Sequence, residues 1–132
     1  MICGLTAYTS GPYFDGAVFL YCDGSSSPKI GGCHIALETF YWNISDPVIR
    51  VEAQTGYWID GLRLITKSGR TSKQYGSYGG ASVIWDLGPY GLSGASGTVN
   101  SDRIINLGLQ YPCAYQLTAL PSDTNSNGLI LW

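Results

Sequence analysis

An internal repeat constrains the fold of this 132-residue chain more than any other feature. Residues 11–16 and 56–61 both begin with glycine, contain two aromatic residues and end in Asp-Gly, and each continues into a strand-like run. A weaker third copy starts at Gly97 and has its aspartate at Asp102. The three aspartates Asp15, Asp60 and Asp102 are 45 and 42 residues apart (60−15 and 102−60), close to a third of the chain (132/3 = 44). The sequence therefore predicts three similar units.

The composition predicts that these units are built from strands. The chain has 18 Gly and 6 Pro beside 10 Tyr and 4 Trp, which is typical of short strands joined by tight turns. Strands are expected at residues 48–52, 62–64, 82–85 and 35–42, with Leu62 and Leu64 facing a core and Arg63 and Lys67 facing water. Residues 69–76 read as a hairpin tip rather than a phosphate loop.

We therefore expect one all-β domain over residues 1–132. A repeat of this length suits three four-stranded sheets or a β-trefoil, and the doubled Gln-x-Trp signature of the trefoil is absent.

Charge and hydropathy argue against several classes of function. The net charge is −2, and the seven basic residues are scattered between Lys29 and Arg103, so a nucleic-acid partner is not expected. No apolar stretch is long enough to cross a membrane. The first six residues lack a basic region followed by an apolar core, so the expected location is cytoplasmic, or outside the cell by a non-classical route.

The four cysteines and two segments that contain asparagine raise three questions: disulfide formation, N-glycosylation and metal binding. Four cysteines could form two disulfides in any of 3 pairings or remain buried thiols. They are Cys3, Cys22, Cys33 and Cys113. Asn43-Ile44-Ser45 fits an N-glycosylation sequon, which matters only in a secreted chain. Residues 123–128 match the start of a calcium loop, but the chain ends before the bidentate acid, so an Asn-Gly turn is favoured and no metal or other cofactor is expected.

No constellation of residues favours catalysis. The only histidine, His34, is next to Cys33, and neighbouring side chains on a strand point to opposite faces. Glu38 and Glu52 are the only glutamates. A glycosidase pair would require two carboxylates within roughly 5–10 Å, and a threefold arrangement should hold the repeated aspartates farther apart.

The repeat resembles the jacalin-related lectin family. The resemblance rests on residues 56–64, on Gly79-Gly80, and on residues 94–97 leading into residues 102–109. It implies a β-prism of three Greek-key sheets with pseudo-threefold symmetry, which binds sugars without metal or catalysis. In that family a Gly-x-x-x-Asp loop and a neighbouring Gly-Gly loop hold the sugar.

Carried onto this sequence, the motif predicts two sugar sites. The third copy of the repeat departs from the motif. A carboxylate can accept two hydroxyl hydrogen bonds from a sugar, glycines let the backbone approach closely, and aromatic rings stack on the apolar sugar face. The third loop is one residue longer and lacks a glycine pair. The candidate carbohydrate-binding residues are Gly11, Tyr13, Phe14, Asp15, Gly31, Gly32, Gly56, Tyr57, Trp58, Ile59, Asp60, Gly79, Gly80 and Asp102.

The expected function is thus reversible binding of neutral glycans, with mannose or glucose units favoured over galactose. Homodimers or homotetramers are expected, because exposed aromatic residues would otherwise form adhesive patches. Two alternatives stay open: a structural coat or matrix protein of the same shape, with the aspartates serving as turn residues, and the glycan-reading module of a membrane-damaging protein.

Overall fold

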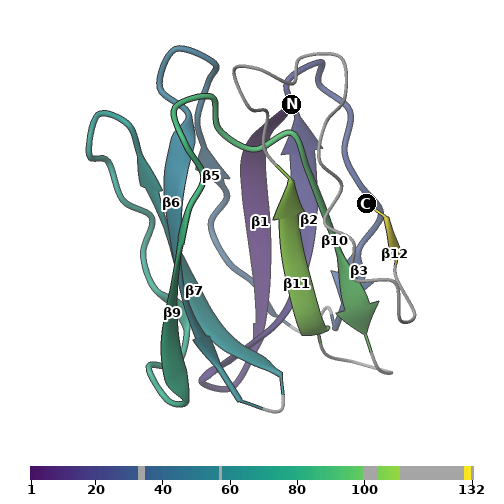
Figure 1. Ribbon diagram of the computed structural model, residues 1–132. Helices are drawn as coiled ribbons and strands as arrows, with labels where there is room; N and C mark the ends of the chain where they lie inside the picture. The colour runs from purple at the N-terminus through teal and green to yellow at the C-terminus, as the bar shows by residue number, and fades with distance from the viewer. Residues whose placement is uncertain (33–34, 57, 100–103, 111–129, 132) are drawn as a thin grey trace.

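The computed structural model describes residues 1–32, 35–56, 58–99, 104–110 and 130–131, and it is all-β within them (Figure 1). Three antiparallel sheets surround one core. The first contains β1 (Ile2–Ser10), β2 (Tyr13–Tyr21), β3 (Ile30–Gly31), β4 (Ile35–Ala36) and β5 (Phe40–Tyr41). The second contains β6 (Val48–Thr55), β7 (Ile59–Thr66), β8 (Tyr75–Gly76) and β9 (Ala81–Asp86). The third contains β10 (Gly94–Val99), β11 (Ile104–Gln110) and β12 (Ile130–Leu131).

Each sheet is built on a long hairpin, as the repeat predicts. The second sheet has the order β8-β7-β6-β9, so the fourth strand returns to lie beside the first in a Greek key. The first sheet repeats this order as β3-β2-β1-β4, and β5 also pairs with β1. The predicted strand at residues 35–42 is therefore two short strands, both on the outer edge of β1.

Alternation of side chains along the hairpins builds the core, because successive residues of a strand face opposite sides. Leu62 and Leu64 are buried, whereas the Arg63 side chain retains 40% exposure and Lys67 is exposed, as predicted. Phe14, Ile59 and Ile104, spaced by 45 residues, are buried as well. The three units thus contribute equivalent residues to one shared core.

The repeat extends into the turns of the first two units. Gly24 and Gly69 have φ of 92° and 95° and occupy matching turns after β2 and β7. Ser27 Oγ accepts a hydrogen bond from the Phe19 amide, and 45 residues later Ser72 Oγ accepts one from the Leu64 amide, both at 2.9 Å. The predicted tip at residues 69–76 is only partly a turn, because its last two residues form β8.

A disulfide between Cys3 and Cys22 closes the open end of the first hairpin. Of the two options that the sequence left open, a disulfide and not a pair of buried thiols is present here, because β1 and β2 bring the two Cα atoms to 5.0 Å, within bonding reach. Cys33 and Cys113 lie outside the described residues. At the same end, the Trp42 indole Nε1 donates to the Ile2 carbonyl at 2.8 Å, which fixes the segment after β5 against β1.

Candidate functional site

The repeated aspartates occupy β-bulges next to the hairpin turns. In the first sheet Tyr8 pairs with Gly16 and Thr9 with Phe14, which leaves Asp15 as the extra residue. In the second sheet Gln54 pairs with Gly61 and Thr55 with Ile59, which leaves Asp60 in the same position. Bulges redirect a side chain out of the regular alternation. The fold thus gives both aspartates the same backbone position.

Asp60 lies in a cradle of glycines at the end of the second sheet. A methyl group on Gly80 would be 2.7 Å from Asp60 Oδ2 and 2.5 Å from the Thr55 carbonyl oxygen, and one on Gly56 would be 3.3 Å from the same Oδ2. Gly80 also has a φ of 79°, which favours glycine. The Asp60 residue is partly exposed, and Gly56, Gly79 and Gly80 are exposed. The predicted association of the acidic turn with this glycine pair is therefore present in the second sheet.

Buried and half-buried polar groups hold the loop that carries the glycine pair. Gln74 Nε2 donates to Gln54 Oε1 at 2.6 Å and to the Ser77 carbonyl at 3.0 Å. The Ser77 amide donates to the Asp60 carbonyl at 3.1 Å, and Ser77 Oγ accepts from the Gly79 amide at 3.3 Å. Gln54 lies on β6, so the loop is tied to both strands of the hairpin.

Tyr75 anchors the same loop from inside the molecule. Its ring is 2% exposed, and its hydroxyl donates to the Glu38 carbonyl of the first unit at 3.3 Å. Burial, and secondarily the Glu38 carboxylate, raise the pKa of Tyr75 to about 12. Tyr75 therefore stays neutral at physiological pH and connects the loop to the neighbouring sheet.

The first acidic turn differs, because Asp15 has 0% exposure. Gly11 has a φ of 59° with nothing within 4 Å of a methyl group on it, so no cradle forms there. Asp15 has no surface with which to reach a ligand in this structure. The first turn is therefore not part of the candidate site, contrary to the sequence expectation.

The two glycine pairs are also not equivalent. Gly31 pairs with Gly16, as Gly76 pairs with Gly61 in the second sheet, so the counterpart of Gly31-Gly32 is Gly76-Ser77. A methyl group on Gly31 would lie 2.4 Å from the Asp15 carbonyl, and Gly32 is buried with its amide donating to that carbonyl at 2.8 Å. Gly31 and Gly32 therefore serve close strand packing. The 45-residue offset between Gly31 and Gly76 is the sequence signal that could have shown that Gly31 corresponds to Gly76 and not to Gly79.

The third unit has no carboxylate at the bulge. Thr98 pairs with Asn106 and Val99 with Ile104, so the extra residue is Ile105, which again follows its counterpart by 45 residues. The repeat in the sequence places Asp102 at this position instead, and Asp102 lies outside the described residues. An aliphatic side chain cannot accept hydroxyl hydrogen bonds.

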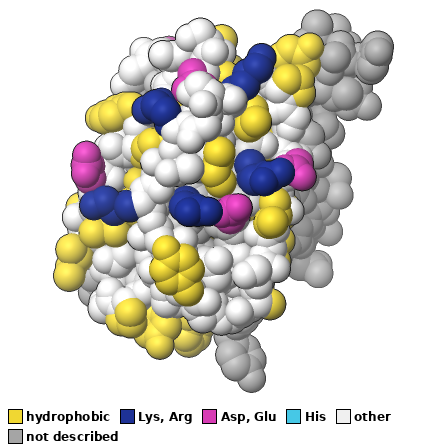
Figure 2. All heavy atoms as spheres, turned by 90° about the vertical axis from the view of Figure 1, so that its left-hand side faces the viewer, with side chains coloured by type: hydrophobic (Ala, Val, Ile, Leu, Met, Phe, Trp, Pro, Cys, Tyr) yellow, Lys and Arg dark blue, Asp and Glu magenta, His cyan; other side chains and the backbone are white. Residues whose placement is uncertain are grey.

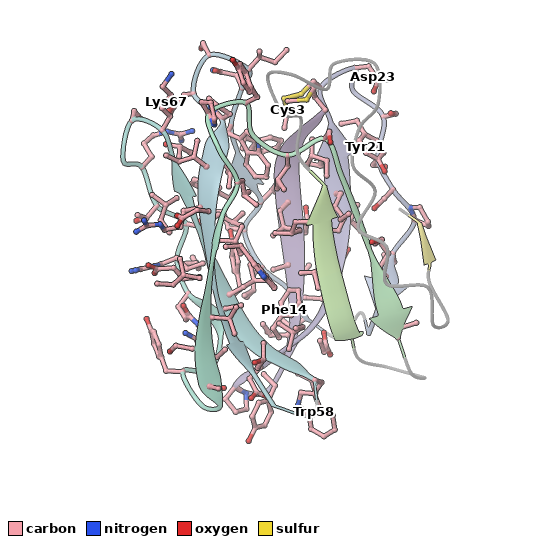
Figure 3. All side chains as sticks on the ribbon, in the orientation of Figure 1. Cys3, Phe14, Tyr21, Asp23, Trp58 and Lys67 are labelled. Atoms are coloured by element: carbon pink, nitrogen blue, oxygen red, sulfur yellow. A yellow bond between two sulfur atoms is a disulfide. The ribbon has the colours of Figure 1, made fainter. Side chains whose placement is uncertain are left out.

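The aromatic candidates divide between core and surface. Phe14 and Ile59 are 1% and 4% exposed, so they are core residues rather than sugar contacts, and Figure 3 shows Phe14 between the sheets. Tyr13 is 40% exposed beside the first turn. Trp58 is partly exposed at the end of the molecule that carries the acidic turns (Figure 3). Tyr57 lies outside the described residues. Sequence reasoning missed Tyr78, which is 74% exposed and directly precedes the glycine pair.

The outer face of the second sheet carries paired charges. Figure 2 shows basic and acidic side chains next to one another on this face. Arg50 contacts Asp86 at 2.9 Å, and Arg63 pairs with Glu52. The described face therefore alternates in charge instead of offering a continuous basic surface.

The described residues hold no group of three or more His, Cys, Asp or Glu side chains that could bind a metal ion. The calcium-loop resemblance at residues 123–128 and the Cys33-His34 pair lie outside them. Within the same described ranges, no helix has the length and hydropathy needed to cross a membrane.

Comparison with known proteins matches this architecture to lectins. No family model and no curated protein matches the sequence. The crystal structure of a prostate-specific WGA16 glycoprotein lectin matches with a TM-score of 0.69 and 18% identity, over 85% of this chain and 83% of that one. The artocarpin–mannotriose complex matches with a TM-score of 0.70 and 18% identity, over 82% and 80%. AcmJRL, a mannose-binding jacalin-related lectin from Ananas comosus, matches with a TM-score of 0.63 and 17% identity, over 82% and 79%.

The protein has the fold of the jacalin-related lectins. The β-prism implied by the family resemblance is confirmed, and the trefoil alternative, which the repeat length had left open, is not needed. Within this jacalin-type prism, the acidic turn with its glycine cradle belongs to the second sheet alone among the described residues.

Proposed function

We propose that the protein is a carbohydrate-binding lectin that holds a neutral glycan at the Asp60 turn. The observation that carries the proposal is the Asp60 carboxylate set against Gly56 and Gly80 at an exposed end of the prism. Adjacent hydroxyls of a sugar would donate to the two carboxylate oxygens in charge-assisted hydrogen bonds. Backbone amides of residues 79–80 are the candidate donors to the remaining sugar oxygens, since no Cβ obstructs their approach.

Aromatic groups around the turn suit a sugar ligand. Trp58 is partly exposed in the turn itself, and Tyr78 is exposed beside the glycine pair. Rings of this kind can pack against the apolar C–H face of a pyranose. Binding needs no covalent step, and we propose no catalysis.

Mannose or glucose units are the favoured ligands. Artocarpin was solved with mannotriose, and AcmJRL is described as mannose-binding, and both share the fold of this chain. The sequence favours the same class of sugar. Binding of methyl α-mannoside and of mannotriose, compared with methyl α-galactoside, tests this preference.

The decisive experiment replaces the carboxylate by an amide of the same shape. Asp60→Asn should weaken glycan binding at least tenfold, because each lost charge-assisted hydrogen bond is worth roughly 1.5–3 kcal/mol. Isothermal titration calorimetry on the purified chain gives affinity and stoichiometry together, with one sugar per chain expected. Asp86→Asn is the matched control, since Asp86 is exposed on the same sheet and pairs with Arg50.

An Asp60→Asn protein that binds sugar as the parent does, with an unchanged melting temperature, would contradict the proposal. The acidic turn would then be a structural element of a coat or matrix protein. Two sugars per chain would instead restore the first turn as a site.

A further inference from the structure

The turn between β5 and β6 presents the only N-x-Ser/Thr sequence of the chain, Asn43-Ile44-Ser45. Asn43 and Asp46 form an isolated bridge, in which the Asp46 amide donates to the Asn43 carbonyl at 3.1 Å. The residues between them form the tip, where Ile44 is 69% exposed. Asn43 and Ser45 are exposed as well.

Both sides of this tip are fixed to the body of the protein. On one side Trp42 is 6% exposed and bonds through Nε1 to the Ile2 carbonyl. On the other, the Asp46 carboxylate accepts from the amide and hydroxyl of Ser68, both at 2.7 Å, and from Arg70 at 3.3 Å. The tip thus projects from flanking residues that are fixed by hydrogen bonds, and a bulky group attached to the tip would not displace core residues.

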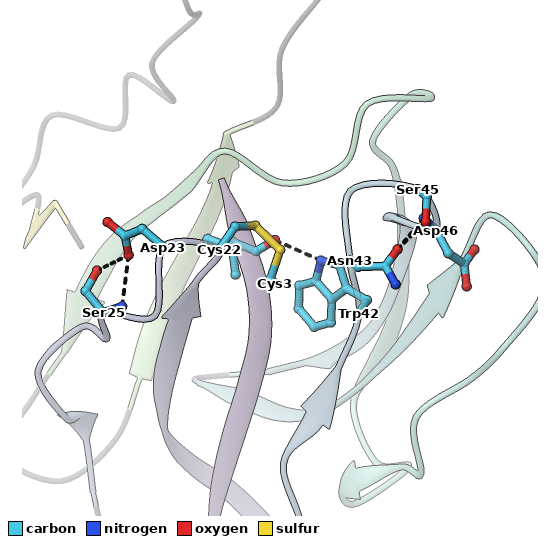
Figure 4. Close-up of a disulfide and its surroundings, with 9 residues drawn as sticks. Cys3, Cys22, Asp23, Ser25, Trp42, Asn43, Ser45 and Asp46 are labelled. Atoms are coloured by element: carbon cyan, nitrogen blue, oxygen red, sulfur yellow. Dashed lines mark hydrogen bonds between the residues drawn. A yellow bond between two sulfur atoms is a disulfide. The ribbon is translucent and has the colours of Figure 1, made fainter.

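The hydrogen bonds of the Asn43 side chain engage its oxygen. Asn43 Oδ1 accepts from Ser45 Oγ at 2.6 Å and from the Asp46 amide at 3.0 Å (Figure 4). Neither bond uses the amide nitrogen Nδ2. The atom that would receive the sugar therefore takes part in neither hydrogen bond, and the Ser45 hydroxyl that the sequon requires lies next to Asn43.

We propose that Asn43 is an N-glycosylation site. A lipid-linked oligosaccharide diphosphate is the donor class, and an oligosaccharyl transferase is the partner. Asn43 Nδ2 forms a bond to the anomeric carbon of the first sugar and gives its proton to a basic group of the transferase. The bond from that carbon to the diphosphate oxygen breaks, and the lipid diphosphate leaves with the electron pair. No oxidation or reduction occurs.

The disulfide at the same end of the molecule is an independent argument. Figure 4 shows Cys3–Cys22 near Trp42 and Asn43. Disulfides form and persist in oxidising compartments, which include the endoplasmic reticulum lumen, where N-linked oligosaccharides are added. A chain that forms this bond in the endoplasmic reticulum, instead of reaching the outside by the non-classical route expected from its first residues, meets the transfer reaction.

The glycan would lie far from the candidate sugar site. Asn43 follows β5 at the disulfide end, and Trp58 is at the opposite end in Figure 3. The eight residues of β6 span roughly 25 Å between these ends. Sugar binding at Asp60 should thus be the same with and without the glycan, and the two proposals fail independently.

The test is secretion of the full chain from cultured eukaryotic cells behind a cleavable signal. We expect intact-mass spectrometry to show one N-linked glycan per chain, which peptide N-glycosidase removes while converting Asn43 to aspartate. Ser45→Thr should keep the glycan, because threonine supplies the same hydroxyl. Ser45→Ala and Asn43→Gln should lose it completely.

The proposal is overturned if the secreted parent chain, with its disulfide formed, carries no glycan at Asn43 while a co-expressed glycoprotein is modified. It is equally overturned if the glycan persists in Ser45→Ala. Since the parent chain and the Ser45→Thr variant decide the first outcome, misfolding of Asn43→Gln would not affect the test.

Discussion

At the residue scale, the candidate site depends on a glycine that leaves room for a carboxylate. Gly80 combines a φ of 79° with a neighbouring Asp60 Oδ2 and Thr55 carbonyl, so a side chain there meets both backbone strain and collision. Gly69 has a φ of 95° but nothing within 4 Å of an added methyl group. Alanine substitutions at Gly69 and Gly80 therefore separate the effect of a positive φ, which both share, from the effect of steric contact, which only Gly80 has.

Gly80→Ala should reduce glycan binding at least tenfold, because the methyl group displaces Asp60 or the loop that carries Gly80. Gly69→Ala should bind sugar normally and should lose only the stability of a left-handed residue, about 1–2 kcal/mol. Calorimetric titration and urea unfolding of both variants check this. Equal sugar affinities in the two variants would exclude the cradle from the site.

Phe14 provides a second residue-scale prediction, since the sequence suggested a sugar contact and the structure places it in the core. Phe14→Ala should destabilise the protein by roughly 3–5 kcal/mol through loss of buried surface and the cavity it leaves. At temperatures where the variant is folded, its affinity for sugar should equal that of the parent. Denaturant unfolding measures the first effect and titration the second.

At the element scale, the first hairpin is closed at both ends. The turn at Gly11 joins β1 to β2, and the Cys3–Cys22 bond links their other ends across 19 residues of sequence. A covalent link across a hairpin reduces the conformational entropy of the unfolded chain. The hairpin of the second sheet has no cysteine and relies on packing and hydrogen bonds.

Replacing Cys3 and Cys22 together by serine should lower the free energy of unfolding by about 3 kcal/mol, as loop-closure entropy gives for a loop of this length. Sugar binding should not change, because the bond lies at the end of the prism away from Trp58. Urea denaturation of the double variant, beside the parent with and without reductant, makes the measurement. A parent chain whose stability does not respond to reductant would contradict it.

The strands and turns could be predicted from the sequence, whereas the bulges could not. Alternation of apolar residues predicted β6, β7 and β9, and the equal spacing of the repeat predicted the matching acidic turns at Asp15 and Asp60. The bulges could not be predicted, because one extra residue in a strand leaves no mark on composition or spacing. Without the bulge register, Asp102 was aligned where Ile105 belongs, and Gly31 was matched to the wrong glycine. The burial of Asp15 depends on tertiary packing, which a repeat that looks equal in sequence does not reveal.

At the scale of the whole molecule, Asp46 connects the segment between the first two sheets to the turn after β7. Hydrogen bonds from Ser68, supported by Arg70, lower the pKa of Asp46 to about 2. A carboxyl group with a depressed pKa stabilises the folded state fully above its ordinary value near 4. That contribution disappears as the pH falls through the folded value.

Asp46→Asn should therefore melt at a lower temperature than the parent at pH 7, and the difference should shrink between pH 4 and pH 2, where the parent is protonated. Thermal unfolding followed by circular dichroism from pH 7 to pH 2 checks the trend. A difference in melting temperature that stays constant over this range would show that the charge of Asp46 does not connect the two segments.

The isoleucine at the third bulge and the inward Asp15 have a consequence for how the protein would act on cells. If, as proposed, the Asp60 turn of the second sheet is the one sugar site, a single chain would cover a glycan-bearing surface without cross-linking it to another. Agglutination of erythrocytes or yeast would then require the chain to form oligomers. A monomer would instead compete with bivalent lectins by occupying the glycans that they bind.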